Sequence, residues 1–109
     1  MKKYDAIIIG FGKGGKTLAA EFAKRQKTVA VVERSNRMYG GTCINIGCIP
    51  TKTLVHLAKE TPTKATWEVK REYYRQAIGC KEEVTSFLRN KNYHNLADNP
   101  NVTVYTGVG

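Results

Sequence analysis

Two cysteines, Cys43 and Cys48 in the segment GGTCINIGCIPTK, are the residues best suited to chemistry in this chain. A disulfide between them would close a ring spanning only positions 43–48, which stabilises a fold by roughly 2 kcal/mol in the chain-entropy model. Positions this far apart diverge by about 140° around a regular helix, so the bond needs a distorted backbone of the kind that Gly47 and Pro50 allow. A short, distorted disulfide is a weak structural cross-link and suits a reversible redox couple.

A zinc site and a pair of unrelated buried thiols are the alternatives to a redox couple. Structural zinc takes four Cys or His ligands at characteristic spacings, but C-x4-C is not a usual spacing, and His56 and His94 show no paired arrangement. We therefore predict no metal site. Lys52 follows Cys48 by about one helical turn, which would place a positive charge on the same helix face. Such a charge beside a cysteine favours reactive sulfur chemistry.

The segment AIIIGFGKGGKT satisfies two phosphate-binding patterns at once. Gly10, Gly12 and Gly15 form G-x-G-x-x-G, the pattern of dinucleotide-binding turns. Gly10 and Gly15 with Lys16 and Thr17 also form G-x-x-x-x-G-K-[ST], the P-loop of nucleotide triphosphatases. Both patterns begin after a strand and open a helix, so their immediate context does not separate them.

The residue that closes the second predicted strand decides between the two patterns. Glu33 ends TVAVVE and follows Gly15 by 18 positions, and a dinucleotide site needs a carboxylate about 20 residues downstream to bind the ribose hydroxyls. A P-loop enzyme instead needs an acidic residue on a neighbouring strand to hold magnesium, and NVTVYTG ends without one. The sequence therefore predicts a dinucleotide site, in which Gly12 lets the backbone approach a pyrophosphate and Gly15 lets helix and strand pack closely.

The elements that must position these residues follow an α/β pattern. YDAIIIG is a continuous apolar run, as expected for a strand of a parallel sheet that is buried on both faces, and the helix after it carries an apolar stripe of Leu18, Ala19, Phe22 and Ala23. We expect a Rossmann-like fold with a parallel sheet built on a right-handed βαβ unit. The predicted elements are strand 4–10, helix 14–26, strand 28–33, a helix from about Pro50, one helix over 64–95 or two joined near Gly79, and a third strand in NPNVTVYTG.

Composition and charge narrow the classes of protein. The net charge is +9, but the 18 Lys and Arg residues are scattered along the chain without a compact basic run, so we predict no nucleic-acid partner. No segment approaches the roughly 20 apolar residues of a membrane span. Three cysteines without an export signal suggest a reducing compartment and a cytoplasmic protein.

The pattern G-G-T-C-x-N-x-G-C-x-P-[ST]-K, after a dinucleotide fingerprint and a ribose-binding Glu33, resembles the class I pyridine nucleotide-disulfide oxidoreductases. Dihydrolipoamide dehydrogenase, glutathione reductase and mercuric reductase belong to that family. The resemblance covers residues 1–109 as the N-terminal part of a Rossmann-like FAD/NAD(P)-binding fold. It implies an incomplete FAD-binding domain, without the NAD(P)-binding and dimerisation domains.

The resemblance also assigns roles. It implies that Gly10, Gly12, Gly15 and Glu33 hold the ADP half of FAD, that Gly41 and Thr42 line the approach to the flavin, that Lys52 lies near the flavin ring, and that Gly109 contacts the adenine through its backbone. NAD(P)H would reduce the flavin, and the flavin would reduce a Cys43–Cys48 disulfide. Cys48 would face the flavin, while Cys43 would attack the substrate, which is a small disulfide, a thiol or a metal ion.

The sequence leaves two alternative functions open, one as part of an enzyme and one as a stand-alone module. In the first, the chain is part of a homodimeric, FAD-dependent disulfide reductase and does not turn over alone, because the family's catalytic base lies in a segment that is absent here. In the second, residues 1–109 act by themselves as a nucleotide-binding or thiol-redox module, and an unfinished sheet edge favours self-association. Cys80 has no counterpart in the redox scheme.

Overall fold

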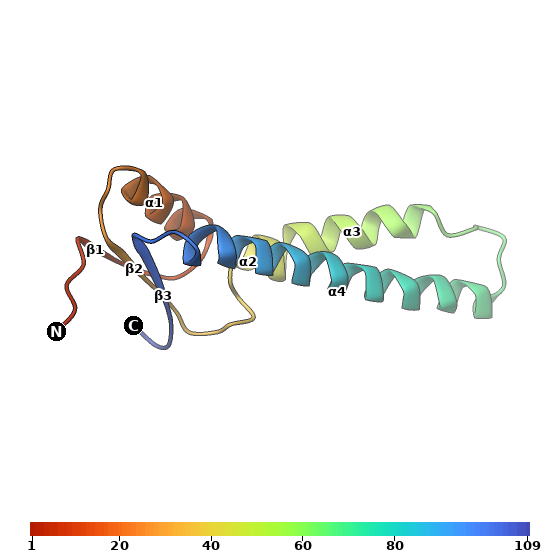
Figure 1. The fold of residues 1–109 in the computed structure, drawn as a ribbon. Coiled ribbons are helices and arrows are strands. Elements are labelled where there is room, and N and C mark those ends of the chain that lie inside the picture. Colours follow the sequence, from red (N-terminus) through yellow and green to blue (C-terminus); the bar gives the residue numbers. More distant parts are fainter.

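The computed structural model describes the whole chain, Met1–Gly109, as a small parallel sheet with helices on one side and a long helical arm (Figure 1). The elements in chain order are β1 (Ala6–Ile9), α1 (Lys13–Lys24), β2 (Val29–Glu33), α2 (Thr42–Asn45), α3 (Cys48–Lys59), α4 (Trp67–Ala97) and β3 (Val102–Thr106). This order confirms the predicted α/β fold and its βαβ unit.

The sheet has the strand order β1-β2-β3, with both neighbouring pairs parallel. Ala6 pairs with Val29, and Val29 pairs with Val102, so the three strands start at the same level. Because all strands run the same way, their carboxyl ends meet at one edge of the sheet. The turn after β1 and the end of β2 both lie at this edge, which is where ligands bind in open α/β sheets.

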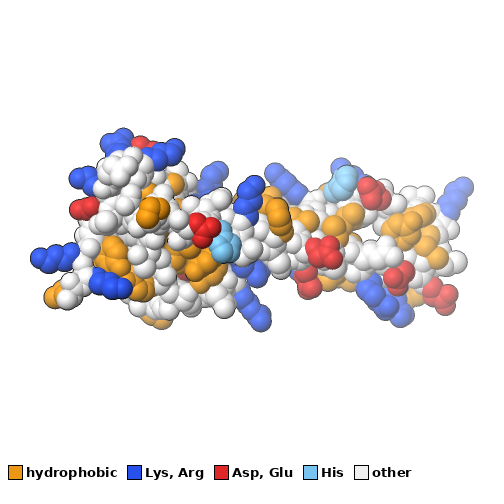
Figure 2. All heavy atoms as spheres, viewed as in Figure 1, with side chains coloured by type: hydrophobic (Ala, Val, Ile, Leu, Met, Phe, Trp, Pro, Cys, Tyr) orange, Lys and Arg blue, Asp and Glu red, His pale blue; other side chains and the backbone are white.

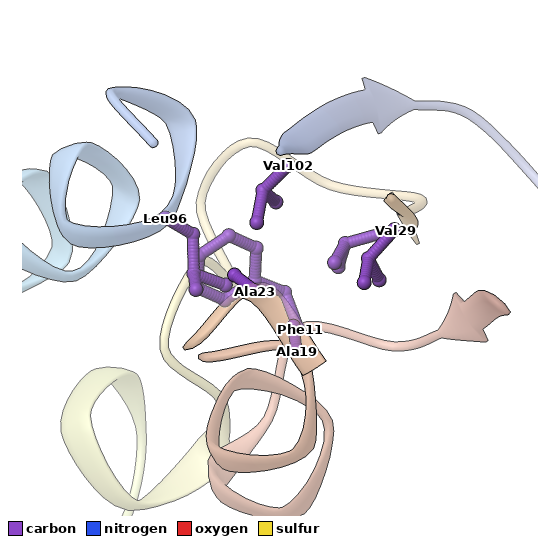
Figure 3. Packing of buried hydrophobic residues seen from close by; sticks show 7 residues of the cluster. Phe11, Ala19, Ala23, Val29, Leu96 and Val102 are labelled. Carbon is purple, nitrogen blue, oxygen red and sulfur yellow. The ribbon is translucent and has the colours of Figure 1, made fainter. Parts of the chain in front are cut away.

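The hydrophobic core lies between one face of the sheet, α1 and the C-terminal end of α4 (Figure 3). Ala19 and Ala23 face the sheet from α1, and Leu96 reaches the same cluster from α4. The small side chains on α1 allow its backbone to pack closely on the strands. The buried members of the cluster are Phe11, Ala19, Ala23, Val29, Val31, Leu96 and Val102.

The opposite face of the sheet is uncovered in this chain. Side chains alternate along β1, so Ala6 and Ile8 pack against the core while Ile7 and Ile9 are 66% and 72% exposed. The prediction that this strand is buried on both faces is therefore wrong for residues 1–109. Both helices that pack on the sheet lie on the same side of it, and no helix of the chain covers the other side (Figure 1).

Helices α3 and α4 form an antiparallel pair that projects from the sheet and makes the molecule 63 Å long (Figure 1). Helix α4 is a single helix through Gly79, and Thr66 caps its amino end by accepting a hydrogen bond from the Val69 amide. Figure 2 shows Lys and Arg side chains spread over both the sheet domain and the arm. None of the helices is both long enough and apolar enough to span a bilayer.

Three details differ from the sequence predictions. Helix α1 ends at Lys24 and not at Gln26, because Gln26 adopts a left-handed backbone conformation with φ 63°. Leu18 lies outside the buried stripe and is 49% exposed. Helix α3 begins at Cys48 and not at Pro50, which occupies its third position. Proline is tolerated there because the amides of the first helical turn have no partner within the helix.

Candidate functional site

The three glycines of the turn after β1, Gly10, Gly12 and Gly15, have different structural roles. Gly10 has φ 104°, a backbone conformation that glycine adopts readily, and its amide donates to the Val32 carbonyl at 2.7 Å. A Cβ at Gly15 would collide with the Gly10 carbonyl oxygen, so Gly15 permits helix α1 to pack against the turn. A Cβ at Gly12 would meet no atom within 4 Å. Gly12 therefore leaves space open at the surface of the turn.

The amino end of α1 has the properties of an anion site. Gly12 caps the helix without a side-chain hydrogen bond, and no acidic residue lies in the first turn. The first amides of the helix are thus unpaired with side chains, and the helix dipole adds partial positive charge at this end. Helix amino ends with these features bind phosphate groups.

Glu33 ends the central strand β2 and lies next to the glycine turn. Its Oε2 accepts a hydrogen bond from the Phe11 amide at 3.0 Å, and its Oε1 accepts one from the Ser35 amide at 3.1 Å. These two bonds fix the orientation of the carboxylate. A carboxylate oxygen has two acceptor positions, so each oxygen retains one for a hydroxyl donor.

A cavity of about 500 Å³ joins these features at the carboxyl edge of the sheet. Six of the residues predicted to bind a cofactor line it, namely Gly10, Gly12, Glu33, Gly41, Thr42 and Gly109. Gly15 lies behind the turn in its packing role, and Lys52 is not among the lining residues. A Cβ at Gly41, where φ is 90°, would lie only 2.8 Å from the Gly12 Cα atom. Close approach of two backbone segments thus forms one wall of the cavity.

The cysteine segment continues directly from this wall. Thr42 lines the cavity and begins α2, Cys43 is the second residue of α2, and Cys48 is the first residue of α3. The helix is interrupted between the two cysteines at Ile46 and Gly47, which confirms the predicted local distortion. Both cysteines carry free thiols, so the Cys43–Cys48 disulfide stays a prediction.

The two sulfurs are close enough to interact. A hydrogen bond with Cys48 raises the pKa of the Cys43 thiol, and burial adds to this effect. The charges of Lys13 and Lys52 lower the same pKa by a smaller amount. Lys52, the lysine predicted to act on the cysteine pair, is thus one of two cations that lower the pKa of the Cys43 thiol.

The structure argues against the P-loop interpretation of the glycine turn. A P-loop lysine must reach the phosphates, but the Lys16 ammonium donates to Asn92 Oδ1 on α4 at 2.6 Å. The Thr17 hydroxyl donates to the Lys13 carbonyl within α1 at 2.6 Å. Neither side chain lines the cavity.

The other candidate groups lie apart from the cysteine pair. His56 is exposed on α3 and faces Glu60, and His94 on α4 faces Asp98. Cys80 is half-buried on α4. No three His, Cys, Asp or Glu side chains come together in a group that could hold a metal ion.

Two residues at the site were missed by the sequence analysis. Asn45 lies between the cysteines and hydrogen-bonds to the backbone before α2, and Arg89 on α4 donates to the Asn45 side chain. The position of Asn45 inside the cysteine motif was a usable signal. No sequence signal pointed to Arg89, because its partner Asn45 lies 44 positions away in the sequence.

A parallel sheet with a glycine turn, a carboxylate on the second strand and a C-x4-C segment at its carboxyl edge is the arrangement expected of a dinucleotide-binding redox domain. The family model described as pyridine nucleotide-disulphide oxidoreductase matches residues 4–108. The chain belongs to this family.

Individual relatives agree with the family assignment. The probable pyridine nucleotide-disulfide oxidoreductase RclA of Escherichia coli is 58% identical over 107 residues, which cover 98% of this chain and 22% of that protein. A mercuric reductase of Lysinibacillus sphaericus is 34% identical over 95% of this chain and 20% of its own length. The chain thus spans about a fifth of the length of these relatives.

A solved structure is also similar. The Cu(II) complex of the HOCl-induced flavoprotein disulfide reductase RclA from Escherichia coli matches with a TM-score of 0.85 and 57% identity, over 99% of this chain and 22% of that one. This match confirms the Rossmann-like fold.

Proposed function

We propose that the chain is the flavin-binding and dithiol-bearing part of an NAD(P)H-dependent disulfide oxidoreductase. The observation that carries the proposal is the continuity of the site, because Thr42 lines the cavity and Cys43, one cysteine of the pair, is the next residue. A cofactor in the cavity would therefore lie beside the dithiol. The family assignment and the relatives' names support the same activity.

The residues present fit an FAD molecule. The cavity volume of about 500 Å³ lies in the usual range of cofactor and ligand pockets, about 300–1,000 Å³. Gly12 and the amino end of α1 would hold the pyrophosphate, and the free acceptor positions of Glu33 would hold the ribose hydroxyls. Gly109 lies against Ile9 at the rim, where its backbone can meet the adenine. Lys52, which does not line the cavity, would act at the flavin end beside the cysteines.

The chemistry of the dithiol follows from the order of the two sulfurs. The Cys43 thiolate attacks one sulfur of a substrate disulfide and displaces a thiol; the Cys48 sulfur then attacks Cys43, which releases the second thiol and leaves the Cys43–Cys48 disulfide. When bound, FAD supplies the two-electron relay by which NAD(P)H returns this disulfide to the dithiol.

The attack by Cys43 needs a base. Because the pKa of its thiol is raised, Cys43 holds its proton more strongly than an ordinary cysteine does. The histidines of this chain face Glu60 and Asp98, so the base belongs to another part of the protein. This requirement supports an enzyme whose site is completed by further chain. The family resemblance implies that this enzyme is a cytoplasmic homodimer.

A metal ion that binds thiolates is the second substrate class. One relative is named a mercuric reductase, and the solved structure of another is a Cu(II) complex. Two adjacent sulfurs suit a soft ion such as Hg(II), and also the Cu(I) that reduction of Cu(II) would produce, since soft thiolate ligands prefer soft ions. Disulfides and metal ions are therefore the substrates to compare.

A chimera tests the proposal. The matching segment of the Escherichia coli relative is replaced by residues 1–109, and the purified protein is examined for bound flavin and for NADH or NADPH oxidation with disulfide and Cu(II) substrates. We expect one flavin per chain and turnover that Cys43→Ser and Cys48→Ser abolish, whereas Cys80→Ser retains it. A colourless chimera, or turnover without either cysteine of the pair, would refute the proposal.

The bare chain tests the stand-alone alternative. If residues 1–109 act alone as a nucleotide-binding module, they retain stoichiometric FAD through gel filtration. We instead expect weak flavin binding, because residues 1–109 form only part of the FAD site. The uncovered sheet face at Ile7 and Ile9 also favours self-association of the isolated chain, which light scattering measures.

A further inference from the structure

The Asn45 side chain ties the cysteine segment to the backbone before it. Its Nδ2 group donates to the Gly41 carbonyl at 2.8 Å and to the Tyr39 carbonyl at 3.0 Å. Asn45 is the last residue of α2, which has only four residues and no side-chain cap at its amino end. A helix this short is unstable by itself, so these two bonds help to hold the turn that carries Cys43.

The Arg89 side chain sets the direction in which Asn45 points. Its Nε donates to Asn45 Oδ1 at 2.8 Å, and both residues are half-buried. An Asn amide has one accepting and one donating end. Since Oδ1 faces the guanidinium, Nδ2 faces the two carbonyls, and a flipped amide would place donor against donor and acceptor against acceptor. Arg89 thereby transmits the position of the rigid helix α4 to α2.

We infer that Arg89 is a positioning residue for the redox site, acting through Asn45 on the geometry of Cys43 relative to Cys48. The inference rests on the proposed function of the cysteine pair. A disulfide forms only over a narrow range of Cβ positions, and the two cysteines lie on different helices, α2 and α3. The hydrogen bonds of Asn45 and Arg89 hold α2 in place, and they therefore raise the effective concentration of the Cys43 sulfur at the Cys48 sulfur.

Charge is not the route of this effect. The cations that act on the Cys43 thiol are Lys13 and Lys52, and Arg89 is not one of them. Arg89 therefore acts through its hydrogen bond, and a variant that retains a donor at this position should retain the effect.

The experiment compares matched variants in the 109-residue chain and in the chimera. Arg89→Met removes the donor at similar length, and Arg89→Lys keeps a charged donor. Lys16→Met is the control, because Lys16 makes a similar cation–amide bond to Asn92 on α4 but does not contact α2. The equilibrium constant of the Cys43–Cys48 disulfide is measured in glutathione buffers, with the pH dependence of Cys43 alkylation and the melting temperature.

We expect Arg89→Met to lower the equilibrium constant of disulfide formation by about tenfold, since a hydrogen bond to a charged group contributes about 1.5–3 kcal/mol and 1.4 kcal/mol is tenfold. Cys43 alkylation should begin at lower pH, because its bond to Cys48 weakens. For Arg89→Lys and Lys16→Met, the equilibrium constant of disulfide formation should stay within about threefold of the wild-type value. Lys16→Met removes a hydrogen bond between α1 and α4, so it controls for the loss of a bond between helices.

Each result has a defined meaning. If Arg89→Met lowers the melting temperature but changes neither the disulfide equilibrium nor the alkylation profile, Arg89 is only structural and the inference is wrong. If Arg89→Met does not fold, Asn45→Ala replaces it, since this variant removes both donors to the carbonyls and the acceptor for Arg89 without adding a charge near Cys43. Asn45→Ala should show the same shift, and no shift refutes the inference. A wild-type chain that forms no Cys43–Cys48 disulfide overturns the proposed function itself.

Discussion

Three glycines of one turn should respond differently to the same substitution by alanine. A Cβ at Gly12 or Gly14 would meet no atom within 4 Å, whereas a Cβ at Gly15 would collide with the Gly10 carbonyl oxygen and lie 3.1 Å from Ile8 Cγ2. The three variants add the same methyl group within a short stretch of chain. They therefore separate the effect on folding from the effect on cofactor binding.

The magnitudes follow from these surroundings. Gly15→Ala forces a backbone oxygen to move, and overpacking of this kind costs about 1–3 kcal/mol, offset by up to about 1 kcal/mol of helix propensity. Gly14→Ala lies on the exposed side of α1 and should gain up to about 1 kcal/mol. Gly12→Ala, at the helix cap, should change stability by about 1 kcal/mol or less. Its methyl group, however, fills the space that a pyrophosphate needs.

Thermal unfolding of the 109-residue chain and flavin titration of the chimera measure the two effects. We expect Gly12→Ala to weaken FAD binding by about tenfold to a hundredfold, from the same overpacking cost, with a nearly unchanged melting temperature. Gly15→Ala should melt several degrees lower, and Gly14→Ala should bind FAD normally. If Gly12→Ala binds FAD as tightly as the wild type, the phosphate does not approach the backbone at this turn and the assigned role of the cavity is wrong.

Two further predictions concern the cysteine pair and the core. Because the hydrogen bond with Cys48 raises the pKa of Cys43, Cys43 alkylation should have a midpoint above the ordinary thiol value of about 8.5; Cys48→Ala should shift it to lower pH, and an unchanged profile would contradict the contact. Leu96→Ala, at a position only 4% exposed in the core, should cost about 2–5 kcal/mol, whereas Leu18→Ala at the exposed position on α1 should cost well under half as much by chemical denaturation. Equal losses at the two positions would show that Leu96 is not packed in the core.

The glycine turn and Glu33 could be predicted from the sequence because their partners are close in the chain. A βαβ unit places the carboxyl ends of two neighbouring strands side by side, so the order of elements already brings Gly12 next to Glu33. The interruption between Cys43 and Cys48 was also local, since Gly47 lies between them.

The exposure of β1 could not be read from the sequence. Its apolar run is the same whether one face or both faces are covered. Only the fold shows that α1 and the end of α4 lie on one side of the sheet and leave Ile7 and Ile9 uncovered. The buried stripe predicted for α1 was likewise too wide, because it included Leu18, which is exposed in the structure.

By itself, the sequence determined the parallel βαβ unit, the dinucleotide turn and the short separation of two sulfurs, because each depends on backbone conformation and on contacts between neighbouring elements. The tertiary structure alone decided the direction of Lys16, which bonds to α4 and not to the cavity, and the contact of Arg89 with Asn45. Both depend on where the helical arm returns to the sheet. Contacts across 44 and 76 positions are set by packing, which leaves no local pattern in the chain.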